Sequence, residues 1–202
     1  MILEAIKKAA LDTWDELLYL VLLNIIWCVG TLLVIPWPLV TFGLFFTVHD
    51  ITEGKSVKIR TFIGHARRTW KEAYIWGGVN VAVLAVLGAN LAFYGRIAVQ
   101  WAATLQLLMI ALIVLWIILQ LVTLPLYPHL EQPGLTIALR NALILIGRYP
   151  VVTLVLIIFI GLLALISSLL PAVAFLITFV LIAMLASWLV KLMVRRELKR
   201  GS

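Results

Sequence analysis

Three side chains that could hold a cation or carry a proton, those of His49, Asp50 and Glu53, lie close together in the sequence. Imidazole and carboxylate groups are common ligands of divalent metals and common proton carriers. No second cluster of such ligands accompanies them in the sequence. We therefore interpret the three residues as the polar end of a helix at a membrane interface, and we predict no metal site.

The other two histidines stand in ordinary surroundings. His65 lies next to Arg67 and Arg68, where we expect it to be solvated, and His129 lies in a loop beside Pro128. The sequence contains no Ser/His/Asp or Cys/His set, no glycine-rich phosphate loop and no Cys-x-x-Cys motif. It therefore predicts that the protein is not an enzyme, with no catalytic residue and no cofactor.

Amide side chains are the strongest polar groups within the apolar stretches. They are Asn24, Asn80, Asn90, Gln100, Gln106 and Gln120. Such amides could line a path for a neutral solute, or they could form hydrogen bonds between helices, because an unpaired amide in hydrocarbon is costly. We favour hydrogen bonds between helices, and we expect Asn24, Asn80 and Gln120 to be the residues that would serve either role.

A basic stretch at residues 56–72 has the pattern of an amphipathic helix. Its apolar residues recur with helical spacing, and Arg60, Arg67, Arg68 and Lys71 fall mostly on the opposite side. The net charge of +7 could suggest nucleic acid, but here the basic residues lie beside apolar runs and alternate with Trp and Phe. We expect membrane lipids as partners, anionic on the cytoplasmic face, and no nucleic acid.

The elements that carry these groups are long and apolar. The chain is 64% hydrophobic with a mean hydropathy of +1.15, and after Glu72 the next carboxylates are Glu131 and Glu197. A run of about 20 apolar residues spans a bilayer. The sequence therefore predicts an all-α, polytopic membrane helix bundle of about six transmembrane helices with amphipathic cytoplasmic helices.

We expect residues 1–202 to form a single integral membrane domain. The predicted parts are an amphipathic N-terminal helix at 1–16, a Pro-broken helical hairpin at 17–48, an interfacial helix at 56–72, two spans within 73–127, a short helix at 134–148 and a C-terminal hairpin at 150–194. Proline lacks the amide donor that a helix interior needs, so a break is expected at Pro36 and Pro38. One long kinked helix over 17–48 is the alternative.

The distribution of positive charge predicts the orientation. In the six-span arrangement every Lys and Arg except Arg96 falls on one face, which the positive-inside rule makes cytoplasmic. We therefore expect a multi-pass protein with both termini in the cytoplasm. A single kinked helix over 17–48 would move the N-terminus to the other side, and the charge asymmetry would be weaker.

Four stretches of the sequence carry a resemblance to a known family. They are LNIIW at 23–27, PWPLVTFG at 36–43, the run from Thr61 to Trp70, and the segment from Pro125 through LTIALRNALILIGRYP. Together they resemble the YesL-like family of small bacterial integral membrane proteins. The resemblance covers most of the chain and implies a multi-helix protein of the bacterial inner (cytoplasmic) membrane. Members occur near genes for carbohydrate utilisation and sugar uptake, and the family has no agreed activity, so it implies no site residues.

Two functions remain open at this point. We favour an inner-membrane accessory or scaffolding protein, associated with carbohydrate uptake, whose partner is a second copy or another membrane protein. The alternative is a small oligomeric transporter or channel for a neutral solute. We expect no proton coupling in either case, because proton-coupled carriers usually place a carboxylate at membrane depth and this chain has none there.

Overall fold

A computed structural model describes residues 2–15, 17–97 and 99–201, and within these ranges the chain is helical with no strand. The prediction of an all-α protein is confirmed to that extent. The helices of the first half are α1 (Ile2–Asp15), α2 (Leu17–Leu32), α3 (Trp37–Thr52), α4 (Ile59–Arg68) and α5 (Trp70–Tyr94). Those of the second half are α6 (Gln100–Leu126), the 3-10 helix η1 (Tyr127–His129), α7 (Leu135–Arg148), α8 (Pro150–Leu169), α9 (Pro171–Val173), the π-helix η2 (Ala174–Thr178) and α10 (Phe179–Gly201).

Four helical stretches in the described residues are long and apolar enough to cross a membrane. They are Trp70–Tyr94, Gln100–His129, Pro150–Leu169 and Pro171–Arg200. The helices α2 and α3 have 16 residues each, fewer than the roughly 20 that a comfortable span needs, although α2 is apolar. The described residues therefore contain four helices of membrane-spanning length, which is consistent with a multi-pass membrane protein.

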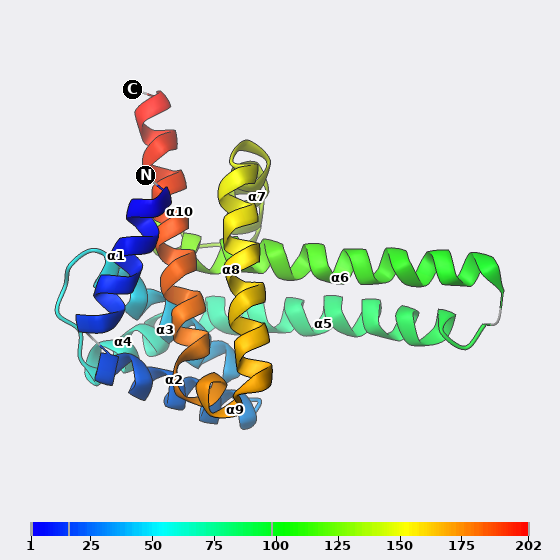
Figure 1. The fold of residues 1–202 in the computed structure, drawn as a ribbon, viewed down its shortest axis with the longest axis horizontal. Helices are drawn as coiled ribbons and strands as arrows, with labels where there is room; N and C mark the ends of the chain where they lie inside the picture. The colour runs from blue at the N-terminus through cyan, green and yellow to red at the C-terminus, as the bar shows by residue number, and fades with distance from the viewer. Residues whose placement is uncertain (1, 16, 98, 202) are drawn as a thin grey trace.

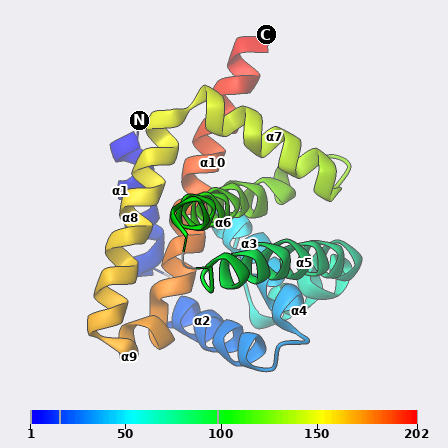
Figure 2. The same cartoon turned by 90° about the vertical axis from the view of Figure 1, so that its right-hand side faces the viewer.

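The membrane-length helices run in two directions. In Figure 1 the hairpin of α5 and α6 extends sideways, whereas α8 and α10 run crosswise to it. Figure 2, turned by a quarter, shows α5 and α6 almost end on and α8 and α10 along their length. Among the described residues no other helix covers the far part of this hairpin, and its side chains such as Val86, Phe93 and Leu107 are exposed.

The core lies where α3, α5, α6 and α10 meet. Phe42 of α3 is buried and packs edge-on against Trp76 of α5 and Tyr127 of η1, with ring centroids 5.8 and 4.9 Å apart. The helix α10 contributes the small residues Ala183 and Ala186, both fully buried, which let neighbouring helices approach closely. This crossing point fixes the ends of the helices that carry the polar groups described below.

Residues 17–48 form two helices joined by a turn at Leu33 to Pro36. Residues on either side of the turn contact one another, since Trp27 Nε1 donates to Thr41 Oγ1 at 3.0 Å and a Cβ on Gly30 would lie 2.6 Å from Val40. Glycine is therefore required at position 30 by the close approach of α3. The turn holds Val34 at a φ of 64°, a left-handed conformation that β-branched residues rarely adopt.

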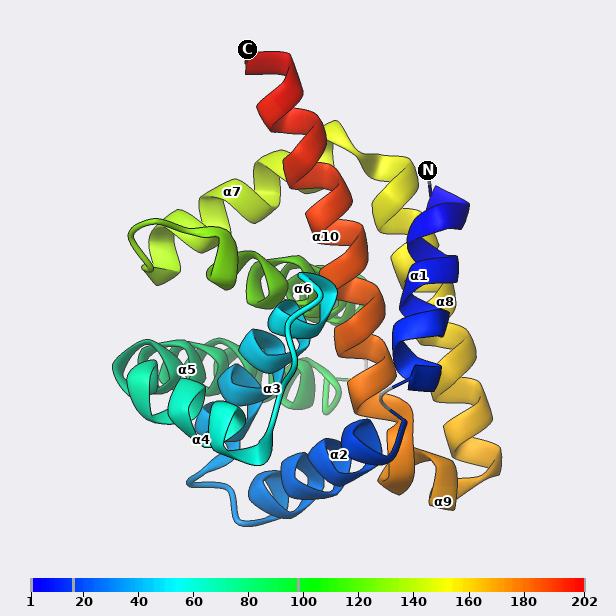
Figure 3. The ribbon, with the colours of Figure 1, turned by 90° about the vertical axis from the view of Figure 1, so that its left-hand side faces the viewer.

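The N-terminal helix does not pack through large apolar residues such as Leu3 and Trp14, which form an apolar stripe in its sequence. Figure 3 shows α1 running along α10, and Ala5 and Ala9 are buried there. Leu3 and Trp14, which belong to the apolar stripe in the sequence, are instead exposed. Small residues form the contact with α10 because they allow the two helix backbones to lie close together, and the larger apolar side chains then face outward.

Candidate functional site

Asn24, one of the three amide residues selected from the sequence, is fully buried and contacts the π-helix η2. Its Nδ2 donates to the backbone oxygen of Phe175 at 2.7 Å, and its Oδ1 accepts from the backbone N–H of Val180 at 3.0 Å. These two backbone groups are five residues apart, and the side-chain amide of Asn24 bridges them. Asn24 thus links α2 to the start of α10.

The predicted amides Asn80 and Gln120 each accept a hydrogen bond from a tryptophan on the opposite helix of the α5–α6 hairpin. Trp76 Nε1 of α5 donates to Gln120 Oε1 of α6 at 2.8 Å, and Trp116 Nε1 of α6 donates to Asn80 Oδ1 of α5 at 2.9 Å. Asn80 Nδ2 also donates to the carbonyl of Trp76 within its own helix. The arrangement is reciprocal, since each helix supplies one indole and one amide.

Sequence reasoning missed the two tryptophans as partners, although the pattern was present. Trp76 stands four residues before Asn80, and Trp116 stands four residues before Gln120. Residues four apart share one face of a helix. Two consecutive antiparallel helices with the same Trp-x-x-x-amide pattern can therefore pair both ways, which is the arrangement observed.

Two of the polar residues expected at the end of α3 form ion pairs, Asp50 with both Lys55 and His65, and Glu53 with Lys191. Asp50 Oδ1 lies 2.7 Å from Lys55 Nζ, and Asp50 Oδ2 lies 2.7 Å from His65 Nε2 on α4. Burial raises the pKa of the Asp50 carboxyl, but the hydrogen bonds from Lys55 and His65 outweigh this effect and hold the pKa below its usual value. Asp50 therefore stays charged and connects α4 to α3.

The ion pair of Glu53 is made with a buried lysine of α10. Lys191 Nζ lies 2.8 Å from Glu53 Oε1 and also donates to the carbonyl oxygen of Thr52, the last residue of α3. A cation at the C-terminal end of a helix is stabilised by the negative end of the helix dipole. The hydrogen bond from Lys191 lowers the pKa of Glu53 despite some burial. In the sequence Lys191 lies close to the basic residues at the end of the chain, and nothing in that pattern predicts its burial.

His49 does not join these ion pairs. Its ring packs edge-on against the ring of His129, with centroids 4.7 Å apart. Burial lowers the pKa of His49, so its neutral form is favoured at neutral pH. Within the described residues no three His, Cys, Asp or Glu side chains converge as metal ligands. His49, Asp50 and Glu53 are thus close in sequence, but each contacts a different set of side chains.

The expectation that His65 is solvated is wrong. Its side chain is only 14% exposed and is held by Asp50, because α4 lies against α3. Phe62 anchors the same helix, since it is buried beside Gly43, where an added Cβ would lie 2.9 Å from the Phe62 ring. With this face turned inward, α4 must present its remaining side chains outward.

The basic residues of the predicted interfacial stretch are exposed, as a headgroup-facing role needs. Arg60, Arg67 and Arg68 lie on α4, and Lys71 lies on the first turn of α5 with its ammonium 5.6 Å from the Trp70 ring centroid. The structure therefore divides the expected single helix over 56–72 between two helices that meet at Thr69.

These contacts hold neighbouring helices together. Comparisons with protein-family models, with curated proteins and with solved structures find no match for this chain. They add no support for the resemblance to the YesL-like family, which stays a prediction.

Proposed function

We propose that the protein is an accessory or scaffolding component of the bacterial inner (cytoplasmic) membrane, and not a carrier in its own right. The reciprocal Trp76–Gln120 and Trp116–Asn80 pairs are the observation that supports this proposal. They occupy the side-chain amide oxygens of Asn80 and Gln120, the two buried amides of α5 and α6. A solute path between these helices would need such groups to be available to the solute.

The topology that goes with this proposal has six spans and both termini in the cytoplasm, which requires the α5–α6 hairpin to turn from its crosswise direction in Figure 1 so that it crosses the same bilayer as α8 and α10. The short α2 and the part of α3 up to Val48 form the first pair of spans, and the exposed basic residues of α4 face anionic headgroups at the cytoplasmic surface. The asymmetry of Lys and Arg, with Arg96 alone on the other face, supports this orientation.

Labelling of single cysteines tests the orientation. Cys28 is first replaced by Ala, and cysteines are then introduced one at a time by Ser56→Cys and Arg96→Cys. An impermeant thiol reagent applied to intact cells is expected to label the variant at position 96 and to leave the variant at position 56 unlabelled until the cells are opened. Labelling of position 56 in intact cells contradicts the proposed orientation.

The carbohydrate-uptake association comes only from the resemblance to YesL-like sequences, so it is tested independently. Tagged protein is purified from membranes of its native host under mild detergent, with an unrelated multi-pass protein as control. We expect a second membrane protein, a component of a sugar-uptake system, to be enriched with it. Recovery of the tagged chain alone contradicts the accessory role.

Reconstitution separates this function from the alternative of a small transporter or channel for a neutral solute. Liposomes containing the purified protein are expected to take up sugars and glycerol no faster than empty liposomes, and a pH-sensitive dye inside them should not respond. Uptake that is lost in the Asn80→Leu and Gln120→Leu variants would instead establish the transporter.

A further inference from the structure

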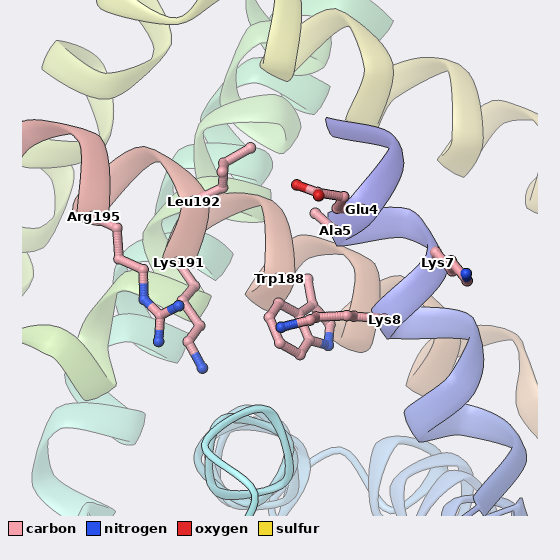
Figure 4. A pocket seen from close by; sticks show the side chains of 8 residues that line it. All are labelled: Glu4, Ala5, Lys7, Lys8, Trp188, Lys191, Leu192 and Arg195. Carbon is pink, nitrogen blue, oxygen red and sulfur yellow. The ribbon is translucent and has the colours of Figure 1, made fainter. Parts of the chain in front are cut away.

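A pocket of about 430 Å³ lies between α1 and α10, away from the polar groups used above except for Lys191. Figure 4 shows the side chains that line it. Four are cationic, namely Lys7 and Lys8 from α1 and Lys191 and Arg195 from α10, and Trp188 forms the wall between them. Glu4 is the one acidic side chain in the lining.

Two of the cations share one aromatic ring. The Nζ atom of Lys191 lies 4.7 Å from the ring centroid of Trp188, and the Nζ atom of Lys8 lies 5.5 Å from it. In Figure 4, Lys8 reaches from α1 across this ring, while Lys191 and Arg195 extend in a similar direction from α10. Trp188 itself is buried, so it holds the two ammonium groups near one another.

The positive charge of the pocket exceeds the negative charge that the described residues supply. Lys191 is paired with Glu53, whereas Arg195 makes no ion pair with any described side chain. Arg195 and Lys8 are both exposed at the pocket. Like charges brought close together repel, and an anion placed between them would convert that repulsion into attraction.

The packing of α1 on α10 is what assembles these charges. Ala5 and Ala9 allow α1 to lie close to α10, and this contact brings Lys8 beside Trp188. The pocket is found where α10 changes from apolar residues to a run of Lys and Arg, which is where a membrane helix meets the cytoplasmic headgroups. Basic pockets of this kind between membrane helices bind anionic lipid headgroups.

We propose that this pocket binds the phosphate of an anionic phospholipid headgroup. Arg195 offers a planar fork of N–H donors that suits two phosphate oxygens, and Lys8 supplies a point charge from the other helix. The apolar parts of Trp188 and Leu192 pack against the glycerol portion. The inference does not rest on the scaffolding role, because it needs only that this end of α10 lies at a membrane surface.

The test uses purified full-length protein in a neutral detergent and a short-chain lipid, dihexanoyl phosphatidylglycerol, titrated by calorimetry below its micelle concentration. The detergent itself carries no charge, so general attraction to an anionic surface comes only from lipid that enters the micelles, and the control variant below measures that contribution. The variant Lys8→Gln/Arg195→Gln is expected to bind the lipid at least tenfold more weakly than the unaltered protein. The charge-conserving variant Lys8→Arg/Arg195→Lys is expected to stay within about threefold of it.

The variant Lys199→Gln/Arg200→Gln is the matched control, since it removes the same amount of charge, here entirely from the end of α10 outside the pocket. It should bind within about twofold of the unaltered protein. Equal weakening in the control and in the pocket variant would overturn the proposal, and so would absence of binding to the unaltered protein. A melting curve establishes that each variant is folded before titration.

Two further titrations identify the source of the phosphate. Dihexanoyl phosphatidylcholine, which carries no net charge, is expected to bind at least tenfold more weakly than the phosphatidylglycerol. Glycerol 3-phosphate and inorganic phosphate should also bind more weakly, because they lack the acyl chains that lie along the helices. Binding of glycerol 3-phosphate as tight as that of the lipid would show a site for a soluble phosphate ester and overturn the lipid assignment.

Discussion

The Nζ atom of Lys191 lies 2.8 Å from Oε1 of Glu53, and the lysine side chain is only 4% exposed. Together with the hydrogen bond to Thr52, this pair ties the end of α3 to the middle of α10. A buried cation is tolerated only where a counter-charge and acceptors surround it. Lys191 therefore has a structural role that the exposed cations at the end of α10 do not share.

Replacing Lys191 with Met should lower the free energy of unfolding by about 2 kcal/mol. The change leaves Glu53 and the Thr52 carbonyl without their donor, and the partial exposure of Glu53 limits the penalty to below that of a fully buried pair. Thermal unfolding in detergent measures it. Lys199→Met serves as the control and should shift the free energy by less than about 0.5 kcal/mol.

Asp50 should make the stability depend on acid pH. Its pKa is lower in the folded protein than in the unfolded chain, where it is about 3.9. The contribution of the carboxylate is therefore fully present above that value and is lost as the pH falls through the folded pKa.

The comparison of the unaltered protein with Asp50→Asn tests this linkage. The difference in melting temperature between the two should be constant from pH 7 to about pH 5 and should shrink towards pH 3. A difference that grows with acidification would mean that the carboxyl is protonated at neutral pH. Glu131→Gln, at an exposed loop position, is the control and should leave the profile unchanged.

The Trp76–Gln120 hydrogen bond should show a measurable coupling energy. A double-mutant cycle with Trp76→Phe and Gln120→Leu is expected to give about 0.6 kcal/mol, the usual size for a hydrogen bond between membrane helices. The same cycle built with the exposed Trp101→Phe in place of Trp76→Phe should give a value near zero. A near-zero value in both cycles would mean that the indole and the amide do not pair in the folded protein.

Val34→Gly should raise the free energy of unfolding by up to about 1 kcal/mol. The left-handed φ of 64° is costly for a residue with a Cβ and easy for glycine, and the gain is reduced by the greater freedom of glycine in the unfolded chain. Val34→Ala retains the Cβ and should change the melting temperature little. The position is 70% exposed, so neither variant removes a core contact.

The helices could be predicted from local signals, and their partners could not. The two segments predicted within 73–127 correspond to the helices Trp70–Tyr94 and Gln100–Leu126. Their hydropathy and the Gly95-Arg96 turn between them are local features of the sequence, so they can be recognised without knowing the fold. The crosswise direction of this hairpin depends on packing at its base, and hydropathy carries no direction. The sequence therefore predicts which segments are apolar but not how they point.

The same limit applies to the charged groups. His49 and Asp50 are adjacent in sequence, yet Asp50 pairs with His65 on the next helix and His49 packs on His129. Successive residues of a helix point in different directions, so closeness in sequence does not bring their side chains to one ligand. The burial of Lys191 also could not be predicted from the sequence, because it depends on where the end of α3 lies relative to α10.

The contact of Asn24 with the π-helix has a consequence for biosynthesis. The helix α2 is synthesised near the start of the chain, but the backbone groups that satisfy its amide, those of Phe175 and Val180, emerge about 150 residues later. Until then Asn24 must keep a partner other than its final one, and an unpaired amide makes insertion into hydrocarbon less favourable. The short α2 is thus expected to settle in the membrane only after α10 has been made, which ties completion of the fold to the last segment of the chain.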